Sequence, residues 1–337
     1  MSGIGGSKLI DVFGLAYPCV DFLIQLREFP DRDGSSPIDN YSLQGGGKVA
    51  TALVTLASLG KEVSVIGKTG DDSLGRFIRD DFIRHDVDID YFHMVSGISS
   101  PFSVVLSDLQ THSRSILWEK GEQVSLEDII PEFQKLKQAR YLHMADANVQ
   151  TIELAKKAQD VDNLNIFYDG DYWDEKTIQI LPYVDILVTS ENFAREYNKQ
   201  NHSPLDFSKI CKDLYTEGPD ITVITLGKEG AIAYDGSKHY SHSAFDIDTV
   251  DTTGAGDVYH GAFIFGLLEQ MKLPKIMEFS AAVAALQTKA LGGRAAIPSL
   301  EDTKRFMESS QPRITGLEEK IEFYKNSFLN YKKELEQ

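Results

Sequence analysis

The residues best suited to chemistry in this sequence lie at 252–257, Thr-Thr-Gly-Ala-Gly-Asp, where one carboxylate, Asp257, ends a run of small side chains. The run stands between a β-branched pair, Thr249 and Val250, which suits the end of a strand, and an apolar segment, 258–268, spaced for a buried helix. Small residues let a ligand approach the main chain, and the free N–H groups of a helix start attract an anion. The run therefore predicts an anion site at the first turn of a buried helix.

Asp257 has two interpretations, because a carboxylate is repelled by an anion bound beside it. In the first, Asp257 is the N-cap of the helix and accepts a backbone N–H, while the glycines only permit the turn. In the second, Asp257 is a general base that takes a proton from a substrate hydroxyl while the adjacent amides hold a phosphoryl group. The six residues alone do not decide between a cap and a base.

Three further glycine-rich stretches have a similar double meaning. Residues 45–52, GGGKVATA, put glycines before a helix, which suits backbone contact with a small polar ligand. Residues 225–231, TLGKEGA, follow a strand at Ile221–Ile224, and open α/β sheets bind ligands at that end of a strand. Residues 292–298, GGRAAIP, end a helix expected to begin near Phe279 and suit the border of a nucleotide base. Each stretch by itself fits a tight turn or a helix cap equally well.

The rest of the chain consists of strand-like and helix-like segments that must position these stretches. From Tyr141 onward, short apolar runs alternate with helical segments, which predicts a mostly parallel sheet covered by helices on both faces. Strands are expected at 9–15, 63–66, 141–144, 166–168, 186–188 and 221–226, and helices at 49–59, 73–85, 152–159, 178–181 and 193–197. Since no repeat or low-complexity linker interrupts this order, the sequence predicts one α/β domain over residues 1–310.

Two polar, β-rich segments, near 20–44 and 91–119, leave this pattern, and we expect them to pair as one small β lid. Alternation predicts one shared apolar face in the second segment, made of Val104, Leu106, Ile116 and Trp118. That face is expected to cover the ligand or to meet the lid of a second copy, because unpaired strand edges tend to find partners. Arg114, near the turn of this hairpin, either reaches an anionic group of the ligand or is simply solvated.

A charged helix is expected at the C-terminal end, over residues 311–337. Its apolar positions follow a heptad seam: Leu317, Ile321, Tyr324, Phe328, Tyr331 and Leu335. The helix either docks on its own domain or self-associates. Docking is favoured, because a seam this short is marginal for a free coiled coil.

The composition argues against some classes of partner. The 337 residues include 34 Lys and Arg against 51 Asp and Glu, a formal net charge of −17, which disfavours binding to nucleic acid and to anionic membranes. The two cysteines, Cys19 and Cys211, show no metal-ligand spacing and fit a reducing compartment. No apolar run approaches the roughly 18 residues of a membrane span, and no signal-peptide core is seen. We therefore expect a cytoplasmic protein with no membrane partner.

The order and separations of these motifs resemble the ribokinase-like (PfkB-type) carbohydrate kinases from about Leu9 to Pro298. Residues 251–257, DTTGAGD, continued by Gly261 and Ala262, resemble the C-terminal signature of the family. GGGKVATALVTLASLG and IGKTGDDSLGRF are similar to its N-terminal signature, and VITLGKEGA is similar to its nucleotide-binding strand and turn. DTTGAGDVYHGAF with GGRAAIP also resembles the branch of hexose, ketose and sulfofructose kinases. The resemblance implies a three-layer α/β fold with a mostly parallel central sheet and a small β lid.

The resemblance also implies roles for individual residues. Asp257 matches the catalytic base of the family, and the anion hole is matched by Gly254, Ala255 and Gly256. The sugar-contacting positions are matched by Asp21, Gly46, Gly47 and Thr51, and the nucleotide-contacting positions by Thr225, Gly227 and Gly230. Asp251 matches a position that, in some members, helps to hold a monovalent cation such as K⁺. Asp169, which follows a strand, is given no role.

The sequence departs from the family pattern at two places. Thr51 stands where many members have Asn for the sugar, and a hydroxyl lacks the separate donor and acceptor ends of an amide, so the preferred sugar is left open. Near the phosphates, where the family has Asn-x-x-Glu, Glu191 replaces the Asn and Ala194 replaces the Glu. Glu191 or Glu196 is expected to act through water on Mg²⁺, which commonly keeps several water ligands.

The resemblance thus predicts an ATP-dependent sugar kinase that binds a sugar, ATP and Mg²⁺, with K⁺ and a homodimer through the lid strands as further expectations. A nucleoside kinase of the same fold is the alternative within the enzyme class. A sugar-binding regulator without turnover is the alternative outside it. A nicotinamide dehydrogenase is excluded because GLAYPC, and not Gly-x-Gly-x-x-Gly, follows the first strand.

Overall fold

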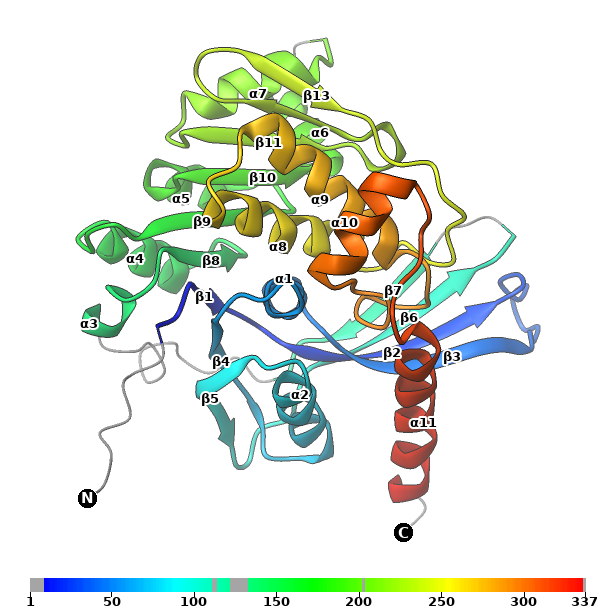
Figure 1. Cartoon of the computed structure of the whole chain (residues 1–337). Helices are drawn as coiled ribbons and strands as arrows, with labels where there is room; N and C mark the ends of the chain where they lie inside the picture. Colours follow the sequence, from blue (N-terminus) through cyan, green and yellow to red (C-terminus); the bar gives the residue numbers. More distant parts are fainter. Residues whose placement is uncertain (1–8, 111–113, 122–132, 202–203, 336–337) are drawn as a thin grey trace.

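The chain is built around a large sheet, seen in the computed structural model, which describes residues 9–110, 114–121, 133–201 and 204–335. Within these residues, nine strands form the sheet in the order β13-β12-β11-β10-β9-β8-β1-β4-β5 (Figure 1). They are β1 (Val12–Leu15), β4 (Val63–Gly70), β5 (Asp88–Val95), β8 (Tyr141–Ala145), β9 (Asn165–Gly170), β10 (Ile186–Ser190), β11 (Ile221–Thr225), β12 (Ala231–Tyr234) and β13 (His239–His242). β12 pairs antiparallel with β11 and β13, and the other neighbouring strands of the sheet pair in parallel. The prediction of a mostly parallel central sheet is confirmed.

Helices cover both faces of this sheet, because the strands carry apolar side chains on both sides. One buried core lies between the sheet and α1 (Lys48–Ser58), α2 (Ser73–Arg84), α8 (Ala255–Leu268) and α9 (Leu273–Gln287). The core on the opposite face involves α3 (Phe133–Leu136), α4 (Val149–Ala158), α5 (Glu175–Ile180), α6 (Glu191–Asn201) and α7 (Phe207–Tyr215). The three-layer prediction is confirmed. Among the described residues, no helix has both the length and the apolar character needed to cross a membrane.

The strand order reverses beside β1, and this reversal places the candidate site. The chain builds β4 and β5 on one side of β1, and later builds β8 to β13 on the other. In open α/β sheets, ligands bind outside the carboxyl ends of the strands at such a reversal. Asp146 directly follows β8, and Asp169 lies near the end of β9, so acidic side chains stand at this edge of the sheet.

A separate four-stranded sheet, the lid, has the order β3-β2-β6-β7 and projects from the central sheet (Figure 1). Its strands are β2 (Cys19–Leu26), β3 (Ile38–Gly46), β6 (Phe102–Asp108) and β7 (Arg114–Glu119). The small β lid is confirmed, but its second segment begins at Phe102 and not near 91, because β5 pairs with β4 in the central sheet. An edge strand such as β5 is only half buried, so its pattern resembles that of a lid strand. Residues 111–113 lie outside the described part of the chain.

The pairing of the lid strands corrects the predicted apolar face. Val104 lies opposite Leu117 in the pairing of β6 with β7, and not opposite Ile116. Opposite residues share a face, as do alternate residues on one strand. Val104 and Leu106 therefore lie on one face of the lid, while Ile116 and Trp118 lie on the other. The prediction of one shared apolar face is therefore wrong, because the register between the strands depends on the turn that joins them and not on the alternation within each strand.

The two faces of the lid have different surroundings. The inner face turns toward the body of the domain, where Leu23 and Val105 form a small core with Leu291. Strand pairing assigns to this face Asp21, Leu23, Ser103, Val105, Ile116 and Trp118. The outer face carries Phe22, Tyr41, Val104 and Leu117.

A C-terminal helix, α11 (Leu317–Leu335), lies along the outer face of the lid (Figure 1). The ring centroid of Phe328 is 4.9 Å from that of Tyr41 and 6.1 Å from that of Phe22. The Tyr331 ring is 5.5 Å from the Phe22 ring. α11 follows α10 (Leu300–Ser309) and also packs on the helices of the domain.

The seam of α11 is directed at its own domain. Tyr324 is fully buried, and Ile321 and Leu317 pack against a buried cluster that includes residues of α9 and α10. The side chain of Leu335 lies outside the described residues. For the described part of the seam, the structure agrees with docking and leaves little of it available for self-association.

Candidate active site

The residues expected to form an anion site lie at the start of α8. Gly254 is the N-cap of α8 and has a left-handed backbone with a φ of 78°. A Cβ on Gly254 would lie 2.7 Å from the Cα of Gly293, so glycine is required there for two reasons. A Cβ on Gly256 would meet no atom within 4 Å, which leaves open space beside the first amides of the helix. The N–H of Ala255 donates a hydrogen bond of 3.2 Å to the carbonyl oxygen of Thr252. The first turn of a helix in general leaves backbone N–H groups without a partner inside the helix, and these suit an anion in the open space beside Gly256.

Asp257 lies in the first turn of α8, three residues after the N-cap. Gly254 occupies the capping position, and no side chain caps this helix. The interpretation of Asp257 as the N-cap is therefore wrong. The Asp257 carboxylate lies instead beside two other titratable side chains.

Asp169 and His260 form a close group with Asp257. Each of the three side chains offers a nitrogen or oxygen atom, and these atoms all lie within 4.8 Å of one another. His260 follows Asp257 by three residues, which places both on one face of α8. His260 Nδ1 is 3.1 Å from Asp169 Oδ2, and both residues are buried. Among the described residues, neither of these two atoms has another partner for a hydrogen bond. An imidazole thus shares a buried site with two carboxylates.

The charges of this group change its titration. Burial and the Asp169 carboxylate raise the pKa of Asp257 to about 7, although His260 and Lys48 oppose the shift. Burial alone would lower the pKa of His260, but the carboxylates of Asp169, Asp257 and Asp171 outweigh it and raise that pKa. Burial would raise the pKa of Asp169, but His260 and Lys48 outweigh burial and hold this pKa below its usual value. A carboxylate that titrates near neutral pH is suited to general-base work.

Lys48 brings a positive charge to the same edge of the sheet. It is the first residue of α1, directly after the three glycines, and its Nζ is 2.9 Å from Asp146 Oδ1 and 3.3 Å from Asp171 Oδ2. Burial would lower the pKa of Lys48, but Asp146, Asp169 and Asp171 outweigh burial and raise it. Lys48 therefore stays charged and offsets part of the negative charge around Asp257.

The three glycines before α1, called the glycine loop (Gly45–Gly47), are glycines for three different reasons. A Cβ on Gly45 would collide with the guanidinium of Arg294, and a Cβ on Gly46 would collide with the carboxylate of Asp21. Gly47 is the N-cap of α1 and has a φ of 95°, which disfavours other residues. The backbone of this loop therefore lies directly against Asp21, where both can contact one ligand.

Asp21 and Thr51 lie beside the glycine loop. Asp21 Oδ1 accepts a hydrogen bond of 2.6 Å from Ser103 Oγ, which joins two lid strands. Burial raises the pKa of Asp21, although the hydrogen bond from Ser103 opposes the shift. Thr51 is buried in α1, and its methyl group points toward Gly293, next to the start of α8. The structure thus brings Asp21, the glycine loop and Thr51 to one place.

Asp251 joins the loop before α8 to the loop after α9. Its Oδ1 accepts hydrogen bonds from the N–H and the hydroxyl of Thr253, at 3.2 and 3.1 Å. Its Oδ2 accepts a hydrogen bond of 2.9 Å from the N–H of Gly292. Both oxygens are therefore engaged with protein donors, and Asp251 fixes the two loops side by side. A role in holding K⁺ stays a prediction.

The residues expected to contact the nucleotide lie at the carboxyl end of β11. Thr225 is the last residue of this strand, and its hydroxyl donates a hydrogen bond of 3.1 Å to the carbonyl oxygen of Thr189 on β10. Gly227 and Gly230 begin and follow a short 3₁₀ helix and have φ of 56° and 93°. These positive φ angles favour glycine at both positions, independently of any contact with a ligand.

The carboxylates expected near Mg²⁺ already have protein partners. Glu191 Oε1 accepts a hydrogen bond of 2.8 Å from Arg195 Nε, and Glu196 Oε2 accepts one of 3.2 Å from the N–H of Trp173. Each contact occupies one acceptor position of a carboxylate, which has several, so both residues can still accept a hydrogen bond from a water of hydrated Mg²⁺. A role of Glu191 or Glu196 toward Mg²⁺ stays a prediction.

Arg114 crosses from the lid to the loop before α8. Its Nη1 donates a hydrogen bond of 3.1 Å to Thr252 Oγ1. Arg114 alternates with Ile116 and Trp118 on β7 and so belongs to the inner face of the lid. The lid and the expected anion site are therefore in direct contact.

The comparison with known families decides the class of the protein. The profile of the family described as "pfkB family carbohydrate kinase" matches residues 8–300. The chain belongs to this family. It is a kinase of sugars or nucleosides, and the expected phosphotransfer to an alcohol group is confirmed at this level.

Relatives within the pfkB family have several names. The chain is 24% identical over 292 residues to a ribokinase of Haemophilus influenzae, covering 86% of this chain and 95% of the relative. It is 28% identical over 301 residues to a 5-dehydro-2-deoxygluconokinase of Clostridium perfringens, with 81% and 86% covered. It is 26% identical over 309 residues to a nucleoside kinase of Methanothermobacter thermautotrophicus, with 88% and 95% covered.

Solved structures agree on the ribokinase-like fold. A putative ribokinase from Agrobacterium tumefaciens superposes with a TM-score of 0.79 at 22% identity, covering 91% of this chain and 100% of that chain. A ribokinase from Arabidopsis thaliana, complexed with ribose and ATP, superposes with a TM-score of 0.74 at 19% identity, with 89% and 99% covered. At these identities the likeness concerns the fold.

Sequence reasoning missed three residues of the candidate site. Lys48 and His260 stand inside quoted motifs but received no role, and Asp169 was noted after a strand without one. A signal for His260 was present, because a residue three positions after Asp257 shares its helix face. Asp169 and Lys48 approach Asp257 only through the strand order, which the sequence does not state.

Proposed function

We propose that this kinase transfers the γ-phosphoryl group of ATP to a hydroxyl of a sugar, with Asp257 as the general base. One observation carries the proposal: Asp257 lies in the first turn of α8, beside open backbone amides, with a pKa raised to about 7. The general base of a phosphoryl transfer must accept a proton close to the site that holds the phosphoryl group. Here Asp257 lies three residues after Gly254, the N-cap of α8.

The proposed reaction assigns a role to each group. Asp257 takes the proton of the acceptor hydroxyl, whose oxygen forms a bond to the γ-phosphorus. The bond from that phosphorus to the bridging oxygen breaks, and ADP leaves with the electron pair. The amides at Gly254, Ala255 and Gly256 stabilise charge on the transferred group. The proposed sugar contacts are Asp21, Gly46, Gly47 and Thr51, and the proposed nucleotide contacts are Thr225, Gly227 and Gly230.

Cations belong to the proposal through the family's chemistry. Mg²⁺ supplied with ATP neutralises phosphate charge, and Glu191 and Glu196 would hold it through water, in keeping with their existing protein partners. K⁺ is proposed beside Asp251. Neither proposal changes the role of Asp257.

The lid supports a sugar acceptor and suggests a dimer. The inner face of β7 combines the cation of Arg114 with the apolar Ile116 and Trp118, which suits a sugar with an anionic substituent beneath a closing lid. β7 is exposed along its whole length, and within the described residues its outer edge pairs with no strand. Because such edges find partners, we propose a homodimer through the lid strands.

A nucleoside kinase is the second candidate, supported by the relative of that name, which covers 88% of the chain. The two acceptor classes differ in size and shape, and an apolar inner face also suits a nucleobase.

The proposal is tested by ADP release from MgATP with a panel of pentoses, hexoses, sugar acids, sugar phosphates and nucleosides. We expect turnover with a sugar or sugar derivative, and we expect Asp257→Asn to lower kcat by about 10²- to 10⁴-fold, the range for loss of a general base. ATP affinity should be unchanged. Preferred turnover of nucleosides supports the second candidate, whereas binding without turnover supports a regulator. Near-normal kcat in Asp257→Asn removes Asp257 from the role of base.

A further inference from the structure

Arg294 is a buried cation where the glycine loop meets the loop that follows α9. Its side chain is 0% exposed, and its guanidinium pairs with the carboxylate of Asp81 on α2, which is 1% exposed. Arg294 Nη2 donates a hydrogen bond of 3.3 Å to the carbonyl oxygen of Gly46, and Gly45 packs directly on the ion pair. A buried ion pair is stable only when further hydrogen bonds complete it. The other partners of Asp81 therefore bear on how firmly the glycine loop is held.

Gln44 extends this network toward the anion site. Its Oε1 accepts a hydrogen bond of 2.8 Å from the N–H of Arg294, and its Nε2 donates one of 2.6 Å to the carbonyl oxygen of Leu291. The neighbouring Gly293 packs against Gly254, the N-cap of α8. One short segment, 291–294, thus contacts both the glycine loop and the loop proposed to hold the phosphoryl group.

Tyr324 of α11 completes the network from outside residues 8–300, the part that matches the family. Its hydroxyl donates a hydrogen bond of 2.9 Å to Asp81 Oδ1 and lies 2.6 Å from His85 Nε2. Tyr324 is 1% exposed. Burial lowers the pKa of His85 to about 4, although Asp81 opposes the shift, so His85 is neutral at pH 7. The neutral hydroxyl of Tyr324 therefore donates to Oδ1 of Asp81, whereas Arg294 pairs with the other oxygen, Oδ2.

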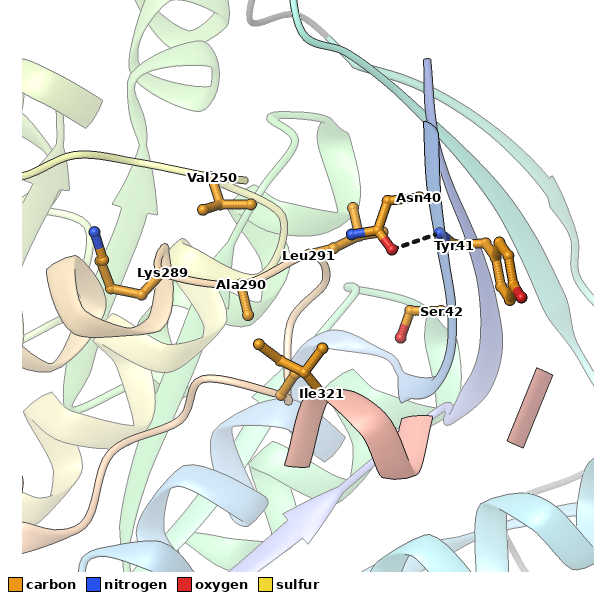
Figure 2. Close-up of a pocket in the computed structure, with 9 residues that line it drawn as sticks. Asn40, Tyr41, Ser42, Val250, Lys289, Ala290, Leu291 and Ile321 are labelled. Carbon is orange, nitrogen blue, oxygen red and sulfur yellow. Dashed lines mark hydrogen bonds between the residues drawn. The ribbon is translucent and has the colours of Figure 1, made fainter. Parts of the chain in front are cut away.

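A cavity lies between Ile321 of α11 and Leu291 of segment 291–294. Figure 2 shows Ile321 of α11 on one side of a cavity, with Asn40 and Ser42 of β3 and Leu291 around it. The cavity has a volume of about 150 Å³. Beside the cavity, Tyr324 packs in one buried cluster with Ala295 and Ala296, so α11 contacts the surroundings of Arg294 both through apolar packing and through the hydroxyl of Tyr324.

We propose that Tyr324 is a positioning residue of the kinase: through Asp81 and Arg294 it holds the glycine loop in the arrangement that binds the acceptor. The link between the loop and the acceptor rests on the proposed function. The mechanical part, that Tyr324 holds the loop, does not. α11 thereby supports the active site although it touches no substrate.

Hydrogen–deuterium exchange on the full chain tests the mechanical part. Tyr324→Phe removes only the hydroxyl, so the variant should fold. We expect peptides covering residues 42–48 and 291–296 to exchange about tenfold faster, because a hydrogen bond to a charged group is lost. Tyr331→Phe is the matched control on the same helix, since among the described residues the hydroxyl of Tyr331 makes no hydrogen bond. Faster exchange confined to α11 and α2 would overturn the proposal.

Kinetics test the functional part, with MgATP and the acceptor that reacts fastest in the panel. In Tyr324→Phe we expect KM for the acceptor to rise about tenfold, while kcat and KM for ATP stay within about twofold of the wild type. A merely structural role would lower the melting temperature and leave both KM values unchanged, which would overturn the proposal. If no acceptor reacts, the proposed function fails, and the exchange experiment still decides whether Tyr324 holds the loop.

Discussion

The core of the candidate site and the lid above it are built in opposite ways. Around Asp257, the side chains of Lys48, Asp169 and His260 come from three different elements and are largely or fully buried. On the inner face of the lid, Ile116 and Trp118 are exposed, and Trp118 is 62% exposed. The first region is charged and fixed by packing, whereas the β7 part of the inner face carries exposed apolar side chains.

This difference separates the chemistry from the choice of acceptor. A reacting group must be held within a fraction of an ångström, and helices and strands packed on a core provide that precision. A thin sheet with one open face can change its side chains without disturbing the core. We therefore expect changes near Asp257 to affect mainly kcat, and changes in the lid to affect mainly KM for the acceptor.

The largest effect should come from filling the open space at the start of α8. Gly256→Val should lower kcat by about 10²- to 10³-fold, the range for damage to an anion hole. The protein should remain folded, because a Cβ at Gly256 meets no protein atom. Steady-state kinetics and a melting curve measure both effects, with Gly256→Ala as a graded control that should lose less. Wild-type kinetics in Gly256→Val would place the phosphoryl group elsewhere.

The next effect concerns pH and distinguishes two buried histidines. With a pKa of about 7, Asp257 is protonated in acid and cannot act as a base, so kcat/KM should fall as pH drops below about 7. The charge of His260 lowers the pKa of Asp257. His260→Gln should therefore move the acidic limb of the pH profile upward by about one unit.

His143 provides the matched control for this experiment. Burial lowers the pKa of His143 to about 4, although Asp169 opposes the shift, so His143 is neutral where the limb is measured. His143→Gln should leave the limb in place. A limb that moves downward in His260→Gln, or moves equally in both variants, would contradict the proposed charge on His260.

The smallest effect on turnover is expected from the lid. Trp118→Ser should raise KM for the acceptor several-fold and leave kcat nearly unchanged, because Trp118 lies on the inner face. Light scattering should show a dimer for the wild type and for Trp118→Ser alike, because the proposed contact uses the backbone edge of β7 and not this side chain. Leu117→Ser, on the outer face, is the control and should change neither property. A monomeric wild type would contradict the proposed dimer. A large loss of kcat in Trp118→Ser would contradict the expectation that changes in the lid affect mainly KM for the acceptor.

The sequence predicted much of the fold because its central strands are short apolar runs with helices between them. Strands that are not short apolar runs between two helices were missed or assigned to the wrong sheet. β12 and β13 are four residues each, and the sequence of β13, HYSH, has no apolar run. β5 was assigned to the lid because an edge strand and a lid strand have the same half-buried pattern.

The candidate site was predictable where one motif contains its parts. Gly254 and Asp257 are neighbours in sequence, so their geometry follows from the start of a helix. The approach of Asp169 and Lys48 depends on strand order, and the division of the lid residues depends on register. These are long-range properties, which local patterns do not encode.

The contact between Arg294 and the carbonyl oxygen of Gly46 joins residues 248 positions apart. Contacts of such long range close a large loop and form late in folding, after local helices and hairpins. The glycine loop and the start of α8 therefore come together only when nearly the whole domain has assembled. In a refolding experiment, enzymatic activity should return after helical structure does, so that partly folded chains hold no competent site with which to consume ATP.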